Sequence, residues 1–494
     1  MSSARVRGGL LLAIDVGTTT VRAILFDLEG RPLSEAYREP MVLHPRPGWA
    51  EVEPEDWWRC VAAVTRQALQ GAPGAGERIV GVGLAGLMHA LVPLDRAGRP
   101  LARAQLWMDQ RCQPQAEWLM REHRPLIRGV LGPRPVTTTW SAPKLRWLSE
   151  HQPELVQRAH SFLSVKDFVR FRLTGTIATD PSDAGGTGLF DPQRGEWSQP
   201  LLELVGVSRE QMAPIRDSSE VAGPVRPEAA SLTGLAAGTP VVIGGSDVKC
   251  TRIGAGAYES DRGCLYLGTS AWIAGPQRRP GSFGATATTG AALKWLVRLF
   301  ALADGDAPGA AYAALLEEAA TVAAGAEGLI FLPHLMGERG PRYDPQARGV
   351  LFGLTLAHGR AQIARAVLEG CALHLRSILD SLGSEPPREI VTVGGGARSA
   401  LWRQIIADAT GACLLVPRVL EAGALGAAIL AGVGLGVYPS VQVAADRLVE
   451  IVEQREPEPA SRALYSRIYR LYLELEERVA PLYAQVPVES GEEV

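Results

Sequence analysis

The sequence predicts an α/β protein built as two similar halves, and two observations support this prediction. First, strand and helix signals alternate along the first half of the chain, as is typical of layered α/β folds. Second, a strand–turn–strand pattern in residues 11–27 returns in residues 263–274, roughly half a chain later. We therefore expect a first domain over residues 1–256 and a second over residues 257–485.

The first copy of the pattern is predicted to be a β-hairpin. An apolar run ends in Asp15, a turn of Gly17, Thr18 and Thr19 follows, and a second apolar run carries the chain back. Glycine allows a tight turn, and the backbone amides and hydroxyl groups after it can converge on a phosphate. An ordinary hairpin with threonine at its turn would explain this copy alone equally well.

Charged residues and the second copy favour a nucleotide site. Asp15 stands at the strand end, where a carboxylate can hold Mg²⁺ directly or through water. Arg22, on the returning strand, can reach the same phosphates with its guanidinium group. Gly268 and Thr269 repeat the turn in the second half. Two such turns in corresponding halves predict a nucleotide held between them.

Composition excludes several classes of partner. The net charge of −3 over 494 residues gives no reason to expect nucleic acid or an anionic membrane surface. The six cysteines show no metal-binding or C-x-x-C spacing, which fits a reduced cytosol. The longest apolar run, residues 422–437, contains five glycines and is shorter than the roughly 20 residues of a membrane span. We expect a soluble, cytoplasmic protein with a disordered tail over residues 486–494.

Two strand ends in the first half are candidates for ligand contacts. The predicted strand over residues 78–86 leads to Met88 and His89, and residues 105–111 place Trp107 and Asp109 near the same mouth. Ligands of α/β sheets commonly bind beyond such strand ends. A single histidine is nevertheless more often structural than functional. The turn-rich stretch 180–191 is predicted to be a loop, without a chemical role.

Two glycine-rich segments complete the candidate site. A buried strand over residues 241–246 ends at Asp247, which would either cap the following helix or act as a general base. The run from Gly394 to Ala397 follows another strand and lets the backbone approach an adenosine closely. Between them, Gly290 opens another predicted helix.

Together these segments resemble the FGGY carbohydrate kinases over residues 10–480. Gly349-x-Leu-x-Gly353-Leu and Ala366-Val-Leu-Glu369 follow that family's C-terminal signature, and residues 144–148 follow its N-terminal one except at the first position. The resemblance implies two actin-like (ribonuclease-H-like) domains with a nucleotide cleft between them. It also implies ATP and Mg²⁺ as cofactors.

The resemblance assigns roles to individual residues. Asp247 would be the general base that takes the proton of a sugar hydroxyl group, and Asp15 would hold the metal. The implied sugar contacts are Met88, His89, Trp107, Asp109 and Asp247. The implied nucleotide contacts are Thr18, Thr19, Arg22, Gly268, Thr269, Gly290, Gly395, Gly396 and Ala397.

Within the family, Met88-His89, residues 141–145 and residues 182–187 are most similar to xylulokinases, which predicts phosphorylation of D-xylulose to D-xylulose 5-phosphate. Val248 stands where xylulokinases commonly have asparagine. Another sugar, a polyol or a sugar acid such as gluconate therefore stays an alternative, as does ribulose. A sugar acid would need a fixed cation, for which Lys249 is the candidate. A non-enzymatic actin-like ATPase switch is the remote alternative, and a homodimer is one assembly open to the chain.

Overall fold

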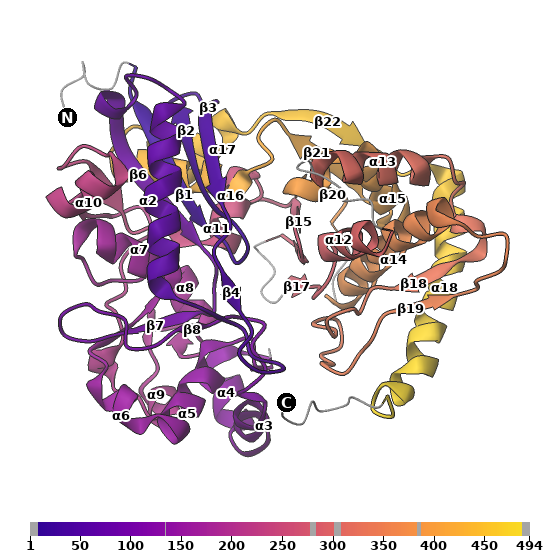
Figure 1. Cartoon of the computed structure of the whole chain (residues 1–494), viewed down its shortest axis with the longest axis horizontal. Coiled ribbons are helices and arrows are strands. Elements are labelled where there is room, and N and C mark those ends of the chain that lie inside the picture. Colours follow the sequence, from indigo (N-terminus) through magenta and orange to yellow (C-terminus); the bar gives the residue numbers. More distant parts are fainter. Residues whose placement is uncertain (1–7, 134, 277–282, 301–307, 383–386, 487–494) are drawn as a thin grey trace. The chain divides into compact units, whose positions relative to one another are not determined.

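The chain folds into two α/β units, which the computed structural model describes over residues 8–133, 135–276, 283–300, 308–382 and 387–486 (Figure 1). The first unit comprises Met1–Gly256 and Glu421–Val449, and the second comprises Ala257–Leu420 and Glu450–Val494. The units thus differ from the predicted ranges in residues 421–449, which pack with the first unit. Apart from Val486, the predicted disordered tail lies outside the described residues.

The first unit is built on a seven-stranded sheet with the order β12-β13-β6-β1-β2-β3, and β14 also pairs with β6. Strands β1, β2 and β3 are antiparallel neighbours, while β6 and β13 run parallel to β1 and β12 is antiparallel to β13. The strands are β1 (Leu10–Val16), β2 (Val21–Asp27), β3 (Pro32–Arg38), β6 (Ile79–Gly86), β12 (Val221–Pro224), β13 (Pro240–Val242) and β14 (Gly245–Ser246).

The second unit repeats this topology. Its six-stranded sheet has the order β17-β16-β15-β20-β21-β22, with the same succession of antiparallel and parallel neighbours. The strands are β15 (Gly263–Leu267), β16 (Ala271–Ala274), β17 (Phe283–Ala285), β20 (Glu389–Val393), β21 (Cys413–Pro417) and β22 (Ile451–Arg455). The predicted α/β class and the duplication are therefore confirmed.

Helices cover both faces of the first sheet. Helix α2 (Pro54–Gln70) starts with proline and two acidic residues, which suit a helix N-terminus, and packs on β1, β2 and β3 (Figure 1). Helices α11 (Asp247–Gly254) and α16 (Ala422–Gly434) lie on the other side. A Cβ atom on Gly83 of β6 would be 1.9 Å from the Ala427 carbonyl oxygen, so glycine permits this close approach. The apolar 422–437 run is thus largely a buried helix.

A mostly helical part of the first unit has its own apolar core, which includes Leu145, Leu189 and Leu202. Its helices are α3 (Gln113–Glu122), α4 (Arg124–Leu131), α5 (Ser141–His151), α6 (Pro153–Arg158), α8 (Pro181–Gly186) and α9 (Gln199–Val205). Helices α7 (Val165–Thr174), α10 (Pro227–Thr233) and α17 (Val441–Leu448) pack nearer the main sheet. The prediction of a loop over residues 180–191 was wrong, because Asp180 caps α8 and β10 (Phe190–Asp191) follows.

Short strands complete this part of the unit. They are β4 (Val42–Leu43), β5 (Glu51–Val52), β7 (Leu91–Leu94), β8 (Ala104–Gln105), β9 (Ser161–Ser164) and β11 (Glu196–Trp197).

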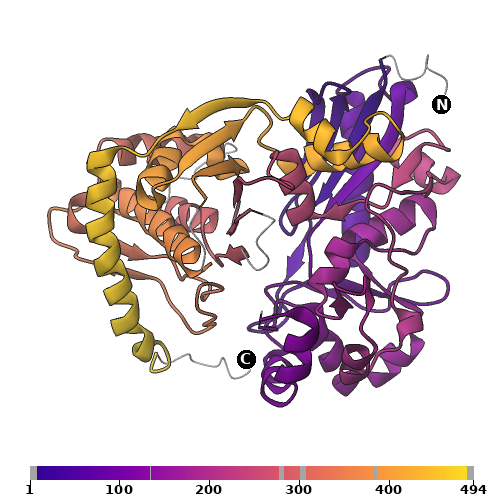
Figure 2. The same ribbon diagram turned by 180° about the vertical axis from the view of Figure 1, so that it is seen from behind.

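In the second unit the long helix α14 (Arg360–Ser381), in orange in Figure 2, is buried from Ala364 to Leu379 except at Arg376. It packs against α13, α15 and β18. The remaining elements are α12 (Gly290–Leu299), α13 (Pro308–Ala320), β18 (Ile330–Leu332), β19 (Val350–Phe352), the short 3₁₀ helix η4 (Gly395–Arg398), α15 (Ala400–Thr410) and α18 (Pro459–Tyr483). None of the helices in the described part of the chain combines the length and apolar character that a membrane crossing requires.

Candidate active site

Three neighbouring strands of the first unit end at one edge of the sheet and lead to the predicted metal ligand, two predicted sugar contacts and the predicted base. Asp15 of β1 pairs with Ala85 of β6, and Ala85 pairs with Gly245 of β14. Because the three strands are parallel, the chain leaves each at the same edge, at Asp15, at Met88 and His89, and at Asp247. Such carboxyl ends of parallel strands are the usual ligand site of α/β sheets.

The carboxylate of Asp15 is in a tight environment. It lies opposite Arg22 in the β1–β2 register, and a Cβ atom on Gly423 would be 2.8 Å from its Oδ2 atom. Burial raises the pKa of Asp15 to about 6, although Arg22 acts in the opposite direction. Nearby Glu421 raises the pKa further. A bound cation would relieve this destabilised charge, so Asp15 fits the metal role predicted for it.

Arg22 already has a partner in the first unit. Its guanidinium group forms a salt bridge with Glu421, the residue before α16, and both side chains are about one quarter exposed. The predicted phosphate contact of Arg22 would therefore compete with this ion pair. Thr19 is exposed at the turn, while the Thr18 hydroxyl accepts a hydrogen bond of 2.9 Å from the Trp107 indole. The structure thus brings a predicted nucleotide residue and a predicted sugar residue together.

Met88 and His89 contact α8. The Nδ1 atom of His89 lies 2.6 Å from the carbonyl oxygen of Gly186 and must donate to it. A Cβ atom on Gly186 would lie 2.5 Å from Cε of Met88. His89 adopts a positive φ of 71°, which is uncommon outside glycine, and Lys144 donates to its carbonyl oxygen over 2.9 Å. The strained backbone and these contacts fix the ring orientation, as a ligand contact requires.

Asp109, a predicted sugar contact, is fully buried and has several hydrogen-bond partners within the protein. Its Oδ1 accepts from the backbone amide and Nε of Arg111, and its Oδ2 accepts from Nη2 of Arg111 and from the amide of Ala50. The Arg111 guanidinium also lies over the Trp49 ring, 3.4 Å from its centroid. These hydrogen bonds join Asp109 to Arg111 and to the backbone of Ala50, and its sugar contact stays a prediction.

The cap of α11 is Ser246, not Asp247. The Ser246 hydroxyl accepts from the amide of Lys249 over 3.3 Å, whereas Asp247 is the first helical residue and its Oδ1 accepts from the amide of Val248. Asp247 is partly exposed. The helix N-terminus favours its negative charge. The capping role considered for Asp247 therefore belongs to its neighbour, and the general-base role stays a prediction.

A buried network of charged residues supports the segment that carries Asp247. Lys166 contacts Asp167, Asp180 and Asp183 at 2.6, 3.1 and 3.0 Å, and all four side chains are essentially inaccessible to solvent. Burial alone would raise the pKa of Asp180, but Lys166 and Lys249 outweigh it and lower the pKa to about 2. Asp180 is therefore a permanent anion at neutral pH.

Asp180 is linked to both sides of Asp247 by serine hydroxyl groups. Ser182 donates to the Asp180 carboxylate and accepts from the amide of Ser246 over 2.9 Å. Ser218 donates to the same carboxylate over 2.8 Å and accepts from Nζ of Lys249 over 2.6 Å. The sequence offered little signal for this network, because its members are spread over residues 166–249.

The predicted nucleotide residues of the second unit converge in the same way. Strands β15 and β20 are parallel neighbours, so the turn at Gly268 and Thr269 and the loop after Gly394 leave adjacent strand ends. The amide of Gly290, at the start of α12, donates to the Gly268 carbonyl oxygen over 3.0 Å. A Cβ atom on Gly290 would be 2.4 Å from that oxygen, whereas nothing lies within 4 Å of one on Gly395. Gly395 is exposed, so its backbone is accessible from solvent.

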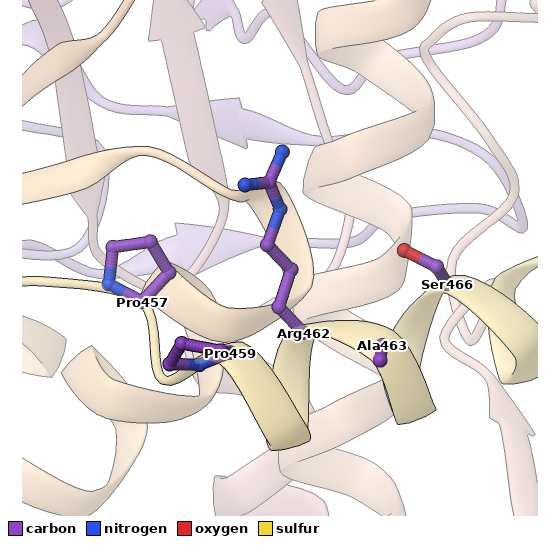
Figure 3. A pocket seen from close by; sticks show the side chains of 5 residues that line it. All are labelled: Pro457, Pro459, Arg462, Ala463 and Ser466. Carbon is purple, nitrogen blue, oxygen red and sulfur yellow. The ribbon is translucent and has the colours of Figure 1, made fainter.

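A separate cavity of about 330 Å³ lies elsewhere in the second unit (Figure 3). It is open to solvent and lined by side chains at the start of α18 and just before it. These are Pro457, Pro459, Arg462, Ala463 and Ser466. None of the predicted site residues lines it, so it is not the candidate active site.

Comparison with known proteins gives consistent matches along the chain. Residues 10–254 match the N-terminal domain, and residues 276–435 the C-terminal domain, of the FGGY family of carbohydrate kinases. The sequence is 32% identical over 499 residues to the xylulose kinase of Escherichia coli K12, covering 97% of this chain and 99% of that protein.

Two solved structures are similar over almost their full length. A gluconate kinase from Lactobacillus acidophilus has a TM-score of 0.86 and 26% identity, over 97% of this chain and all of that chain. A xylulose kinase from Rhodospirillum rubrum has a TM-score of 0.80 and 31% identity, over 96% of this chain and all of that one.

Proposed function

Because the chain belongs to the FGGY family of carbohydrate kinases, we propose that it transfers the terminal phosphoryl group of ATP to a hydroxyl group of D-xylulose, with Asp247 as the general base. The observation that carries the proposal is the strand-end arrangement of the first unit. It gives one sheet edge a candidate metal carboxylate, a candidate sugar contact and a partly exposed carboxylate.

In this mechanism Asp247 accepts the proton of the sugar hydroxyl group as its oxygen attacks the γ-phosphorus. Phosphoryl transfer needs little covalent help from the protein, so positioning and charge stabilisation supply most of the acceleration. The hydrogen bonds of Ser246 to Ser182 and of Lys249 to Ser218 hold the chain on both sides of Asp247. His89, fixed by Gly186, and Met88 would orient the sugar.

The nucleotide would be held by the glycine-rich segments. Thr18 and Thr19 would donate to phosphate oxygens in the first unit, as would Gly268 and Thr269 in the second. Gly395 to Ala397, and Gly290, would contact the adenosine. Asp15 would hold Mg²⁺ directly or through water, and the ion would neutralise phosphate charge. The raised pKa of Asp15 supports this role, because the carboxylate lacks full charge compensation without a cation.

The position of Lys249 favours a neutral sugar over a sugar acid. A sugar acid needs a fixed cation beside Asp247, and the Lys249 ammonium group instead contacts Ser218, on the path to Asp180. Val248 provides no polar side-chain atom at the adjacent position, so a neighbour or water would complete the sugar's hydrogen bonds. The similarity to a gluconate kinase keeps aldonates in the test.

The experiment is a coupled assay of ADP release with purified protein, Mg²⁺ and ATP across ketoses, polyols and aldonates. We expect kcat/KM to be highest for D-xylulose among the pentuloses and polyols, and aldonates to give little turnover. A higher kcat/KM for gluconate or for another ketose would refute the substrate assignment. ADP release that no sugar stimulates would refute the kinase mechanism.

A further inference from the structure

The second unit contains a buried cluster of two histidines and two glutamates that the proposed reaction does not use. His334 and Glu338 follow β18, His374 lies in α14, and Glu476 lies in α18. The two histidines are 1% exposed, Glu338 is 8% exposed, and the Glu476 side chain is 15% exposed. Titratable groups with this burial need partners, because a charge or polar atom removed from water is otherwise costly.

The four side chains contact one another in pairs. Nε2 of His334 lies 3.0 Å from Oε1 of Glu476, and Nε2 of His374 lies 3.7 Å from Oε1 of Glu338. The two imidazole rings pack edge to face with centroids 5.0 Å apart. One possible ligand atom each from His334, Glu338 and Glu476 lies within 4.8 Å of the other two.

Both histidines have a buried ring nitrogen without a hydrogen-bond partner. Nε2 of His374 donates to the carbonyl oxygen of Gly340 over 2.7 Å, and Nε2 of His334 faces Glu476. In each ring the other nitrogen, Nδ1, is buried and unpartnered among the described residues. Two packed imidazole rings that each have an unsatisfied buried nitrogen are unusual in a protein interior and call for an explanation.

The charges of the two glutamates also need an explanation. The ion pairs within the described ranges give Glu338 and Glu476 histidine partners only. If the imidazoles are neutral, two largely buried carboxylates lack a counter-charge. If the imidazoles are protonated, each Nδ1–H becomes a buried donor without an acceptor. A divalent cation would neutralise the two carboxylates and accept a lone pair from the neutral imidazole of His334.

We propose that His334, Glu338 and Glu476 bind one divalent transition-metal ion of the Zn²⁺ class. Mixed imidazole and carboxylate ligands suit this class better than Mg²⁺, which prefers oxygen ligands and water. Zn²⁺ holds such ligands at about 2.0–2.2 Å, so modest side-chain rotations from the 4.8 Å spacing close the site. The ion would tie the C-terminal helix α18 to the segment after β18.

The test uses the full chain after treatment with a chelator and dialysis. ZnCl₂ is titrated calorimetrically in the presence of excess Mg²⁺, so that oxygen-ligand sites such as that proposed at Asp15 are filled. We expect saturable binding of one Zn²⁺ per chain and a rise in the unfolding temperature. His334→Gln and Glu476→Gln should each weaken Zn²⁺ binding by about 10- to 100-fold or more, the range that even supporting residues reach at metal sites.

Two control variants separate this site from others. His358 belongs to the same unit but bonds to Thr355, so His358→Gln should bind Zn²⁺ as the wild type does. Asp15→Asn should also keep wild-type Zn²⁺ affinity, which distinguishes this ion from the one proposed for catalysis. If His334→Gln does not fold, the wild type decides: bound Co²⁺ should give visible absorption that saturates at one equivalent and is displaced by Zn²⁺. The absence of saturable Zn²⁺ or Co²⁺ binding, or unchanged affinity in both ligand variants, would overturn the proposal.

Discussion

The two glycine–threonine hairpins share a turn but differ in the residues that face each other across it. In the first hairpin Asp15 pairs with Arg22, and the salt bridge from Arg22 to Glu421 adds a third charge. In the second, Tyr266 pairs with Trp272, and their rings stack at 5.9 Å with an interplanar angle of 17°. The second pair therefore offers aromatic surface where the first offers charge.

This difference indicates a division of labour after duplication. Charged groups beside a phosphate turn can hold a metal ion and stabilise charge that develops during transfer. An aromatic pair can shape and stiffen a binding surface but supplies no charge. We infer that the first hairpin takes part in chemistry and the second in nucleotide affinity. Variants of the first hairpin should then change kcat, and variants of the second hairpin should change the KM for ATP.

The largest effect is expected from Asp247→Asn. The amide keeps the shape of the side chain but cannot take a proton, and general-base catalysis typically contributes about 10² to 10⁴-fold. We expect kcat to fall by that factor while nucleotide affinity changes little. Asp217→Asn, an exposed change in the same unit, is the control. A kcat within a few-fold of the wild type would show that Asp247 is not the base.

Asp15→Asn should lower kcat by about 10² to 10³-fold, the usual result of removing one electrostatic contact to the transition state. The same variant should stabilise the metal-free fold at pH 7.5. Burial raises the pKa of Asp15 to about 6, so its ionisation destabilises the native state as pH rises from about 4 to 6. Asparagine removes this penalty, on the order of 1–3 kcal/mol.

Thermal unfolding in EDTA measures that stability effect. The difference between Asp15→Asn and the wild type should be present above about pH 6 and vanish below about pH 4. Equal pH dependence of the two proteins, together with unchanged Mg²⁺ dependence of the residual activity, would contradict the metal role of Asp15.

The matched pair Gly17→Ala and Gly268→Ala compares the hairpins directly. A Cβ atom on Gly17 would lie 2.9 Å from the Thr20 backbone oxygen, and one on Gly268 would lie 2.5 Å from the Tyr266 ring. A backbone clash beside Asp15 moves the turn, and misplacement by about 1 Å can cost 10²-fold, so we expect a 10- to 100-fold loss of kcat for Gly17→Ala. Gly268→Ala should raise the KM for ATP a few-fold. The reverse pattern in steady-state kinetics would refute the division of labour.

The smallest effect is expected from Val248→Asn, which adds a polar group beside Asp247. A new hydrogen bond to a sugar hydroxyl group would raise kcat/KM for D-xylulose by roughly tenfold per 1.4 kcal/mol gained. We expect only a few-fold change, because a neighbour or water already serves that hydroxyl group in our proposal. A more than tenfold rise in kcat/KM for D-xylulose, relative to the kcat/KM for the best other sugar, would show that D-xylulose is not the native substrate.

The sequence predicted local elements well where one pattern decides them. The alternation of apolar residues and the turn at Gly17 sufficed for the first hairpin, and its repeat at Gly268 sufficed for the duplication. Partners distant in sequence could not be predicted in this way. Glu421 reaches Arg22 because α16 returns to the first unit, and no local signal marks that return.

The same limit applies to individual site residues. The place of Asp109 after a strand predicted a sugar contact, which stays a prediction, but its hydrogen bonds to Arg111 and Ala50 could not be read from the sequence. From the sequence, either Ser246 or Asp247 could cap α11, and the structure shows that the Ser246 hydroxyl group is the cap. Side-chain partners, unlike strand periodicity, depend on which segments the fold brings together.

We propose that this chain phosphorylates D-xylulose with Asp247 as the base. The most direct measurement is ³¹P and ¹³C NMR of the product from ¹³C-labelled D-xylulose, ATP and Mg²⁺, for the wild type and for Asp247→Asn at equal concentration. We predict ADP and a phosphate ester coupled to C5 of the sugar with the wild type, and almost none with the variant over the same time. Unchanged D-xylulose with the wild type, or equal product from both proteins, would contradict the account.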